Sequence, residues 1–147
     1  MQAKTIYVLN GPNLNLLGVR EPHLYGSTTL AQVEKLCRRV TDELGYACEF
    51  HQTNHEGVMV DWVQEARERA AAVVINPAGL SFRSIPLLDA LKTLDVPIAE
   101  VHVTNIHRRD VLYQNSLVSL AATGVICGFG PFGYELALRA LAQRLAS

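Results

Sequence analysis

The stretch Ala72-Val73-Val74-Ile75 decides the fold class of this 147-residue chain. Its consecutive apolar residues, most of them β-branched, predict a strand that is covered on both faces. Such strands occur in parallel sheets, where the crossover connections place helices on both sides. Similar apolar runs predict the complete set of strands, at residues 5–10, 46–53, 72–76, 97–104 and 123–128.

Stretches with helical spacing of apolar residues lie between the expected strands. The clearest covers residues 30–44 and ends before Gly45. Comparable stretches lie at residues 61–70, 85–94 and 134–145. We therefore predict five βα units that form a flavodoxin-like three-layer α/β sandwich, with a five-stranded parallel sheet in the order 2-1-3-4-5. Because no linker or repeat interrupts the pattern, residues 1–147 are expected to form a single domain.

Composition and charge exclude several classes of protein. Hydrophobic residues make up 49% of the chain and charged residues 18%, which argues against intrinsic disorder. The net charge of −1 supplies no cationic excess for nucleic acid or for a membrane surface. Residues 1–4 lead into an apolar stretch that is too short for a secretion signal, which predicts a cytoplasmic protein. The three cysteines are widely spaced and predict no metal site.

Polar residues follow four of the expected strands, at residues 10–15, 52–57, 76–79 and 100–105. In a parallel sheet of this kind, ligands bind outside the carboxyl ends of the strands. A single asparagine at such a position can merely cap a turn. Four polar strand ends together predict a binding site for a small molecule. No phosphate-binding loop, dinucleotide fingerprint, serine elbow or zinc-protease helix is present in the sequence.

The segment between residues 9 and 26 is a predicted loop of about 15 residues, which is long enough to act as a lid. Within it, Arg20 precedes Tyr25. A guanidinium beside a phenol stabilises the phenolate, so Tyr25 could act as a base near neutral pH. The pair could also be a surface arginine that stacks on a tyrosine, and the spacing alone does not separate the two interpretations.

These motifs resemble the type II 3-dehydroquinate dehydratase family, which forms 3-dehydroshikimate by loss of water without a covalent intermediate. The family pattern N-G-P-N-L-N-L-L-G-x-R-E-P-x-x-Y-G is matched throughout residues 10–26. Further matches lie at residues 52–57, 76–77, 89–90, 100–102, 105 and 124–133. The resemblance spans almost the whole chain, and it implies a homo-oligomer (a dodecamer built of trimers) with no metal or organic cofactor.

The resemblance also implies a role for each reacting residue. Tyr25 would remove the C2 proton as a phenolate that Arg20 stabilises, and Asn13 would hold the enolate through a water. His102 would protonate the departing C1 hydroxyl, with Glu100 as its orienting partner. For substrate binding, the resemblance implies four further residues: Asn76 near the departing hydroxyl, Val103 and Thr104 at the carboxylate, and Asp89 contributed by a neighbouring subunit.

Two positions depart from the family pattern. Phe82 stands where the family has histidine, and Tyr113 stands where it has arginine. In the family, these two side chains contact hydroxyls on the far side of the substrate ring, together with the aspartate that corresponds to Asp89. The reacting half of the expected site is therefore kept, and the half that contacts the ring hydroxyls is altered. Either Arg83 or Arg109 could restore a cationic contact.

Three functions stay open on the sequence alone. The first is a lyase that dehydrates 3-dehydroquinate, in shikimate biosynthesis or in quinate catabolism. The second, suggested by Phe82 and Tyr113, is a dehydratase paralogue for a related cyclic hydroxy-keto acid. The third is a non-catalytic binding module, against which the joint presence of Arg20, Tyr25 and His102 argues. The remaining histidines have no assigned role, namely His51, His55 and His107.

Overall fold

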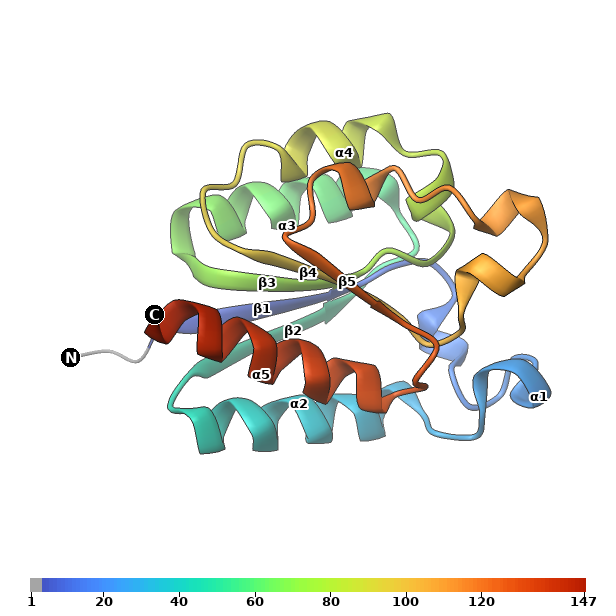
Figure 1. The fold of residues 1–147 in the computed structure, drawn as a ribbon, viewed down its shortest axis with the longest axis horizontal. Coiled ribbons are helices and arrows are strands. Elements are labelled where there is room, and N and C mark those ends of the chain that lie inside the picture. Colours follow the sequence, from blue (N-terminus) through green and yellow to red (C-terminus); the bar gives the residue numbers. More distant parts are fainter. Residues whose placement is uncertain (1–3) are drawn as a thin grey trace.

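A five-stranded parallel sheet lies at the centre of the protein (Figure 1). The structure is a computed structural model that describes residues 4–147. The prediction of a cytoplasmic location uses residues 1–4, and residues 1–3 of that segment lie outside the described residues. The strands are β1 (Thr5–Asn10), β2 (Ala47–Gln52), β3 (Ala70–Asn76), β4 (Ile98–His102) and β5 (Gly124–Cys127). Their order in the sheet is β2-β1-β3-β4-β5, which confirms the predicted fold class and strand order.

Helices cover both faces of the sheet (Figure 1). On one face, α2 (Leu30–Leu44) packs beside α5 (Phe132–Ala146). On the other face, α3 (Glu56–Arg69) packs beside α4 (Ile85–Leu91). Within residues 4–147, none of the helices combines the length and the apolar character needed to cross a membrane.

The middle of β3 shows why a continuous apolar run predicts this architecture. Ala72 and Val74 pack into the core on the side of α2 and α5. Val73 and Ile75 pack into the core on the opposite side. All four are fully buried. Because successive side chains of a strand point to opposite faces, a strand that is covered by helices on both faces has no position for a solvated side chain.

Local signals mark both ends of α2, whose bounds agree with the predicted residues 30–44. The Thr29 hydroxyl accepts a hydrogen bond from the Gln32 backbone at 3.2 Å, and the Gln32 side chain accepts one from the Thr29 backbone at 2.9 Å. Gly45 ends the helix in the left-handed conformation, at φ 86°. A helix with both a capping box and a glycine terminator is predictable from sequence.

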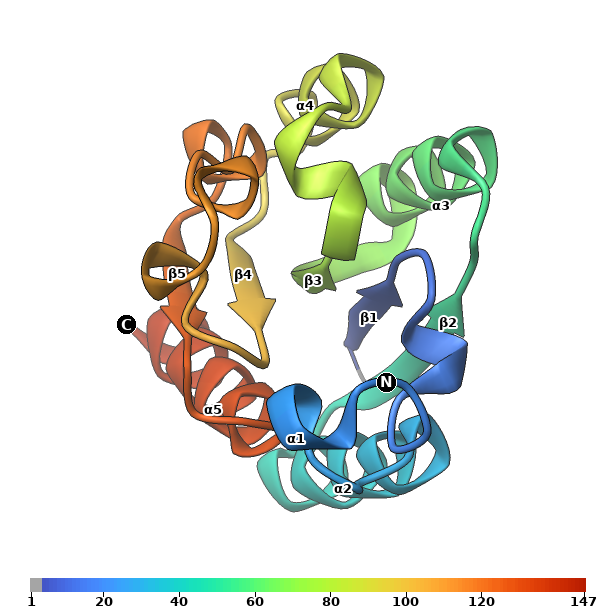
Figure 2. The ribbon, with the colours of Figure 1, turned by 90° about the vertical axis from the view of Figure 1, so that its right-hand side faces the viewer.

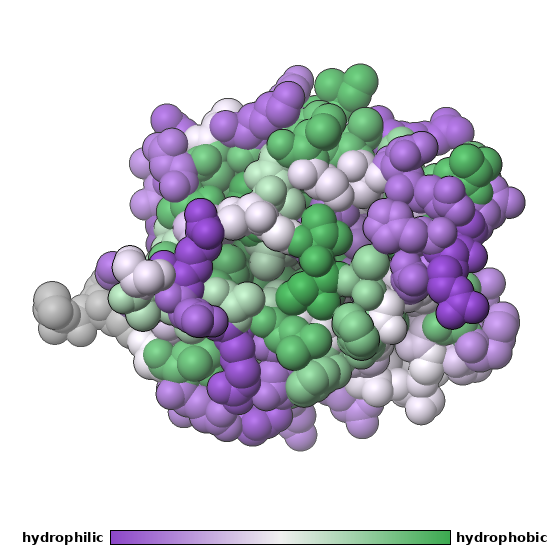
Figure 3. Space-filling view, viewed as in Figure 1, coloured by the Kyte–Doolittle hydropathy of each residue, from purple (hydrophilic) through white to green (hydrophobic). Residues whose placement is uncertain are grey.

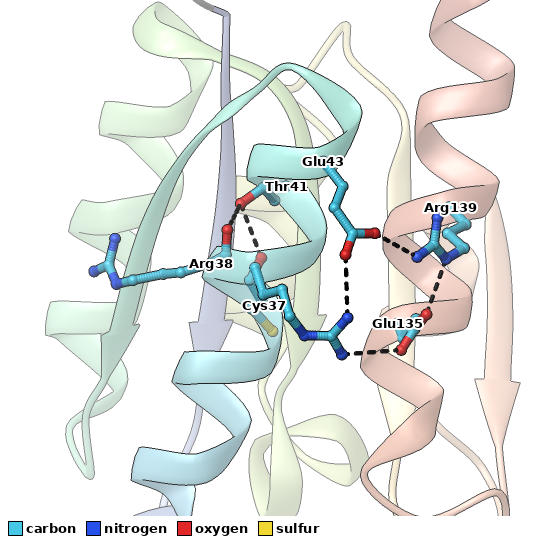
Figure 4. A network of polar contacts seen from close by, with 7 residues as sticks. Cys37, Arg38, Thr41, Glu43, Glu135 and Arg139 are labelled. Atoms are coloured by element: carbon cyan, nitrogen blue, oxygen red, sulfur yellow. Dashed lines mark hydrogen bonds and ion pairs between the residues drawn. The ribbon is translucent and has the colours of Figure 1, made fainter.

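Charged side chains join α2 to α5 at the surface (Figure 4). Arg139 on α5 donates hydrogen bonds to Glu43 on α2 and to Glu135, each at 3.0 Å. Arg39 on α2 lies 3.2 Å from Glu43 and 3.8 Å from Glu135. The hydrogen bond from Arg139 holds the pKa of Glu43 below its ordinary value. Because Glu43 and both arginines are exposed, these pairs contribute little to the free energy of folding.

The connection from β4 to β5 differs from the prediction of five βα units. It contains the short 3-10 turns η3 (Ile106–Arg108), η4 (Val111–Tyr113) and η5 (Val118–Leu120), and no α-helix. The Asn105 and Asp110 side chains accept hydrogen bonds from backbone groups within η3 and η4. Such side-chain caps start new turns and compete with one continuous helix. The fourth crossover is therefore made of short turns: η3 and η4 lie at the carboxyl end of the sheet, and η5 packs beside α4 (Figure 1).

Other predicted boundaries shift by a few residues. α3 begins at Glu56 instead of residue 61, because the helix already starts at the hydrogen bond from the Met59 backbone to the His55 carbonyl. β3 begins at Ala70, whereas the apolar pattern predicts residue 70 as the end of the preceding helix and residue 72 as the start of the strand. α4 ends at Leu91, before the expected residue 94. Apolar spacing locates each element but does not mark its ends.

Candidate active site

A pocket of about 220 Å³ opens at the carboxyl ends of β1, β3 and β4. Figure 2 looks onto this end of the sheet. Three segments form its walls: the loop between β1 and α2, the 3-10 helix η2 (Ala78–Phe82) after β3, and the turns after β4. The pocket lies at the edge of the sheet where the polar strand ends predict a binding site.

Nearly all residues proposed from the sequence share this pocket. Its lining includes Asn13, Arg20, Tyr25, Asn76, Phe82, His102, Val103, Thr104 and Tyr113. Glu100 lies beneath the pocket, where it is bonded to His102. Asp89 lies on α4 with an exposed side chain and does not line the pocket of its own chain.

The segment between β1 and α2 has more regular structure than the predicted loop. It contains the 3-10 turn η1 (Leu14–Leu16) and the single helical turn α1 (Pro22–Tyr25). The Tyr25 backbone donates a hydrogen bond to the Glu21 carbonyl at 3.0 Å. Pro22 occupies the first position of α1, where its fixed φ favours the start of a helix. This turn carries Tyr25 to the pocket.

Two guanidinium groups lie against the ring of Tyr25. The central guanidinium carbon of Arg20 is 4.9 Å from the ring centre, and that of Arg109 is 5.5 Å from it. Arg20 also lies 3.4 Å from the exposed Glu21, which offsets part of its charge. Arg20 and Tyr25 are therefore neighbours, as the sequence predicts, and Arg109 adds a second positive charge. The pocket therefore brings two positive charges to the face of this phenol ring.

His102 and Glu100 form a buried pair. Nε2 of His102 hydrogen-bonds to the Glu100 carboxylate, which also accepts hydrogen bonds from Ser116 and Ser119 at 2.7 Å each. Burial opposes the ionisation of Glu100, but the hydrogen bonds from His102, Ser119 and Ser116 outweigh it and hold the carboxyl pKa below its ordinary value. Glu100 is therefore ionised at neutral pH and accepts the Nε2 proton, so that Nδ1 is the nitrogen of His102 that can exchange a proton with a ligand.

The serines of this pair were missed by sequence reasoning. Ser116 and Ser119 lie in the irregular connection after β4. A hydroxyl in such a segment has no periodicity that would link it to a residue on a distant strand.

A buried hydrogen-bond chain supports Asn76. The Tyr134 hydroxyl accepts a hydrogen bond from Asn76 Nδ2 at 2.9 Å and donates one to Asn10 Oδ1 at 2.7 Å. Asn76 Oδ1 accepts a further bond from the Ala78 backbone at 3.3 Å. Sequence reasoning assigned Tyr134 only to the apolar face of its helix. A buried tyrosine hydroxyl normally finds a partner, and this was the available signal for its second role.

The end of β2 supports the loop between β1 and α2 instead of lining the pocket. Asn54 Oδ1 accepts hydrogen bonds from the Asn13 backbone at 2.9 Å and from the Gln52 side chain at 3.1 Å. Gln52 also donates to the Gly11 carbonyl at 3.2 Å. Asn13 adopts the left-handed conformation at φ 70°, which asparagine tolerates. The expectation that four strand ends line the pocket is wrong for the second strand, which does not line it. Asn54, which follows that strand, instead accepts a hydrogen bond from the Asn13 backbone.

Aromatic rings form the altered side of the pocket. The rings of Phe82 and Tyr113 meet edge to face at 5.5 Å, and the Phe82 ring lies 6.4 Å from the imidazole of His102. The Arg109 guanidinium lies 4.0 Å from the centre of the Tyr113 ring. Of the two arginines proposed as replacements, Arg109 lines the pocket, whereas Arg83 is exposed and does not.

The donors of this pocket suit an organic acid with carbonyl and hydroxyl groups. Amides, a hydroxyl and guanidinium groups can bind a carboxylate or an enolate, while a phenol and an imidazole can exchange protons. In the part of the chain that the structure describes, no group of three or more His, Cys, Asp or Glu residues is arranged to hold a metal ion. The arrangement can therefore supply one base, one acid and several stabilising donors.

Comparison with known proteins connects the pocket to one family. The model of the family "Dehydroquinase class II" matches residues 4–142. The chain is 55% identical over 136 residues to 3-dehydroquinate dehydratase 1 of Agrobacterium fabrum, which covers 92% of this chain and 94% of that protein. It is 49% identical over 141 residues to 3-dehydroquinate dehydratase 2 of Pseudomonas aeruginosa, with 96% and 95% covered.

Solved structures agree with this comparison. The type II dehydroquinase of Propionibacterium acnes superimposes with a TM-score of 0.92 at 45% identity, over 97% of this chain and 98% of that one. A 3-dehydroquinate dehydratase-like protein from Bifidobacterium longum superimposes with a TM-score of 0.73 at 32% identity, over 98% and 99%.

Proposed function

The chain belongs to the class II dehydroquinase family, and we propose that its pocket dehydrates 3-dehydroquinate to 3-dehydroshikimate, with Tyr25 as the base and His102 as the acid. The chain is thus a hydro-lyase, and its reaction is a step of the shikimate pathway. One observation carries the assignment of these roles. Tyr25 with its two guanidinium neighbours and His102 with its buried carboxylate line the same pocket.

The first step of the proposed mechanism is proton abstraction. Tyr25, as a phenolate, takes the C2 proton next to the C3 ketone, and the electrons of the C–H bond form an enolate. Arg20 and Arg109 lower the energy of the phenolate through their charge. Asn13 lines the pocket and holds the enolate oxygen through a water.

The second step is loss of the C1 hydroxyl. The enolate collapses, the C1–C2 double bond forms and the C1–O bond breaks. His102 gives its proton to the departing oxygen, which leaves as water. Glu100 stabilises the protonated imidazole and fixes its orientation through Nε2. Tyr25 then releases the proton taken from C2 to solvent, and His102 regains a proton from solvent, so that both groups return to their starting states.

The remaining donors bind the substrate in the proposed complex. The Val103 backbone and the Thr104 hydroxyl take the carboxylate, and both residues line the pocket. Asn76 contacts the region of the departing hydroxyl, held there by Tyr134. This arrangement places the C1 substituents at the carboxyl end of β4, beside His102.

A direct assay tests the function. 3-Dehydroquinate is added to the purified protein, and the ultraviolet absorbance of the conjugated enone product is recorded over time. We expect turnover by the wild type and a loss of about 100-fold or more in Tyr25→Phe, because general base catalysis contributes on the order of 10²- to 10⁴-fold. Tyr46→Phe is the matched control, since Tyr46 lies outside the pocket. Equal rates for the wild type and Tyr25→Phe would contradict the proposal.

A second candidate substrate is a cyclic hydroxy-keto acid that lacks a ring hydroxyl. The aromatic contact between Phe82 and Tyr113 favours it, because a hydroxyl against the Phe82 ring loses water without gaining a partner. The comparison is kcat/KM for 3-dehydroquinate and for analogues without the C4 or C5 hydroxyl. If the analogue is the better substrate, Phe82→His combined with Tyr113→Arg should improve turnover of 3-dehydroquinate. The third function that the sequence leaves open is a non-catalytic binding module. No observation favours it, and the chain belongs to a family of enzymes.

We also propose that the protein assembles as a dodecamer of trimers in which Asp89 completes a neighbouring pocket. Hydrophobic side chains gather on the face around the edge strand β5, where Val125 is 42% exposed (Figure 3). Asp89 is exposed and lies outside its own pocket. Light scattering gives the molar mass. Mixing inactive Asp89→Ala and Tyr25→Phe subunits should restore some activity, whereas a fully active monomer would contradict this assembly.

A further inference from the structure

Arg109 is held by an aromatic ring and not by a carboxylate. Its guanidinium lies 4.0 Å from the centre of the Tyr113 ring and forms one long hydrogen bond, of 3.5 Å, to the Thr104 hydroxyl. Among the residues that the structure describes, no carboxylate lies within ion-pair distance of Arg109. The Tyr113 ring and this long hydrogen bond are therefore what hold the Arg109 guanidinium among the described residues.

We propose that Tyr113 is a positioning residue of the dehydration reaction, whose ring holds Arg109 against Tyr25. The inference rests on the proposed role of Tyr25 as a phenolate base. A row of alternating contacts carries it: Tyr113 stacks on Arg109 at 4.0 Å, and Arg109 in turn faces Tyr25 at 5.5 Å. Tyr113 acts through Arg109, without contact to the reacting atoms.

The chain between the two residues is built to keep them stacked. The Tyr113 backbone donates a hydrogen bond to the Asp110 carbonyl at 2.9 Å, which closes η4. The Gln114 side chain donates to the Arg109 carbonyl at 2.7 Å and so links the two ends of this segment. The edge-to-face contact with Phe82 at 5.5 Å holds the Tyr113 ring from another side. Hydrogen bonds of the backbone therefore fix the segment that carries Arg109 and Tyr113, and the Phe82 ring packs against the Tyr113 ring.

An aromatic ring suits this task better than an acid. A carboxylate beside Arg109 would hold the guanidinium but would also neutralise its charge. The face of a phenol ring attracts the cation through its quadrupole and carries no net charge. Tyr113 therefore holds the flexible side chain of Arg109, while the full positive charge of Arg109 stays available to Tyr25.

The other charged groups near Tyr25 make this charge important. Arg20 lies against the same ring, but the Glu21 carboxylate is 3.4 Å from it. Arg108 lines a neighbouring groove together with Tyr25, and His102 lines the pocket. Of the two guanidinium groups against the ring, Arg109 is thus the one without an acidic partner among the described residues.

Two substitutions at one position test the proposal. Tyr113→Phe keeps the ring face, and we expect kcat within about twofold of the wild type, since cation–π attraction does not need the hydroxyl. Tyr113→Leu removes the ring, and we expect kcat to fall about 5- to 30-fold, with the acid-side limb of the pH–rate profile moved to higher pH. Val111→Ala is the control, because Val111 lies on the same turn with a side chain that is 69% exposed. If Tyr113→Leu does not fold, Tyr113→Met replaces it.

A double-mutant comparison separates positioning from general damage. In the Arg109→Met background, Tyr113→Leu should lower kcat by less than about twofold, because the cation it positions is gone. An equal loss in both backgrounds would overturn the proposal, and so would equal behaviour of Tyr113→Phe and Tyr113→Leu.

A measurement without substrate keeps this test independent of the proposed function. The ultraviolet absorbance of the Tyr25 phenolate is obtained as the difference between each variant and the same variant with Tyr25→Phe. This absorbance should appear at higher pH in Tyr113→Leu than in Tyr113→Phe. Equal titrations would overturn the role of Tyr113. Absence of Tyr25-dependent turnover in the wild type would instead overturn the proposed function.

Discussion

The hydroxyl of Tyr134, beneath the pocket, holds the side chain of Asn76 in position. Tyr134 is fully buried, yet its hydroxyl takes part in two hydrogen bonds, one from Asn76 and one to Asn10. Burial raises the pKa of this phenol, so it stays protonated and can donate. One hydroxyl thus bonds two buried amides at the ends of neighbouring strands, and it orients the amide of Asn76 in the pocket lining.

Removal of this hydroxyl should weaken both folding and binding. Tyr134→Phe leaves Asn76 Nδ2 and Asn10 Oδ1 without their hydrogen-bond partner. We expect the free energy of unfolding to fall by about 2–6 kcal/mol, at ~1–3 kcal/mol for each unsatisfied atom. KM should rise because Asn76 loses its support. Equilibrium urea unfolding and steady-state kinetics measure the two effects. Tyr46→Phe is the control, and equal stabilities of the two variants would show that the buried chain contributes nothing.

Contacts between elements bring the loops after β1 and β3 together. The Gly11 backbone donates a hydrogen bond to the Asn76 carbonyl at 2.9 Å. A Cβ atom at Gly11 would lie 2.4 Å from the Pro77 carbonyl oxygen, which is closer than such atoms approach. Only glycine permits this distance. Because Asn13 follows in the same loop, the packing of two strand ends determines where a pocket residue lies.

Two glycine substitutions with opposite expected effects test this contact. Gly11→Ala must push the two loops apart, and we expect a loss of about 1–3 kcal/mol in the free energy of unfolding together with lower kcat/KM. Gly57→Ala is the matched control, because Gly57 lies in α3 and a Cβ there meets no atom within 4 Å. That change should stabilise by about 0.4–1 kcal/mol. Thermal unfolding compares them, and a neutral Gly11→Ala would refute the steric argument.

Across the whole molecule, Glu100 ties the central sheet to the irregular connection before β5. It is fully buried on β4, and it accepts hydrogen bonds from His102, Ser116 and Ser119. Although burial opposes its charge, these bonds hold its pKa below the ordinary value in the folded state. The unfolded chain therefore binds a proton at this group more readily than the folded protein does. This difference couples the stability of the entire fold to pH.

The direction of the pH dependence follows from this difference. The stability that Glu100 contributes is present above its unfolded pKa, near 4.3, and is lost as the pH falls through the lower folded pKa. Glu100→Gln cannot titrate, so its melting temperature should fall less steeply than that of the wild type below about pH 4. Glu68→Gln is the control, because Glu68 has a side chain that is 71% exposed. Parallel acid limbs for the wild type and Glu100→Gln would exclude this linkage.

Much of the fold and part of the site could be predicted from local patterns. The run at residues 72–75 predicts a strand buried on both faces, and the capping residues of α2 predict its bounds. The proximity of Arg20 and Tyr25 also follows from their spacing in one short segment. In each case the residues that interact lie close together in the chain, so the physical cause is contained in a short stretch of sequence.

The sequence by itself determined the sheet, its strand order and the edge at which a ligand site forms, because apolar periodicity and the handedness of crossovers act within each βα unit. Only the tertiary structure decided which side chains support that site. The Tyr134 hydroxyl reaches Asn10 across 124 positions of the chain, and Ser119 reaches Glu100 across 19. Such contacts depend on distances between packed elements, which no local pattern records. The same packing, and not spacing alone, stacks Arg109 between Tyr113 and Tyr25.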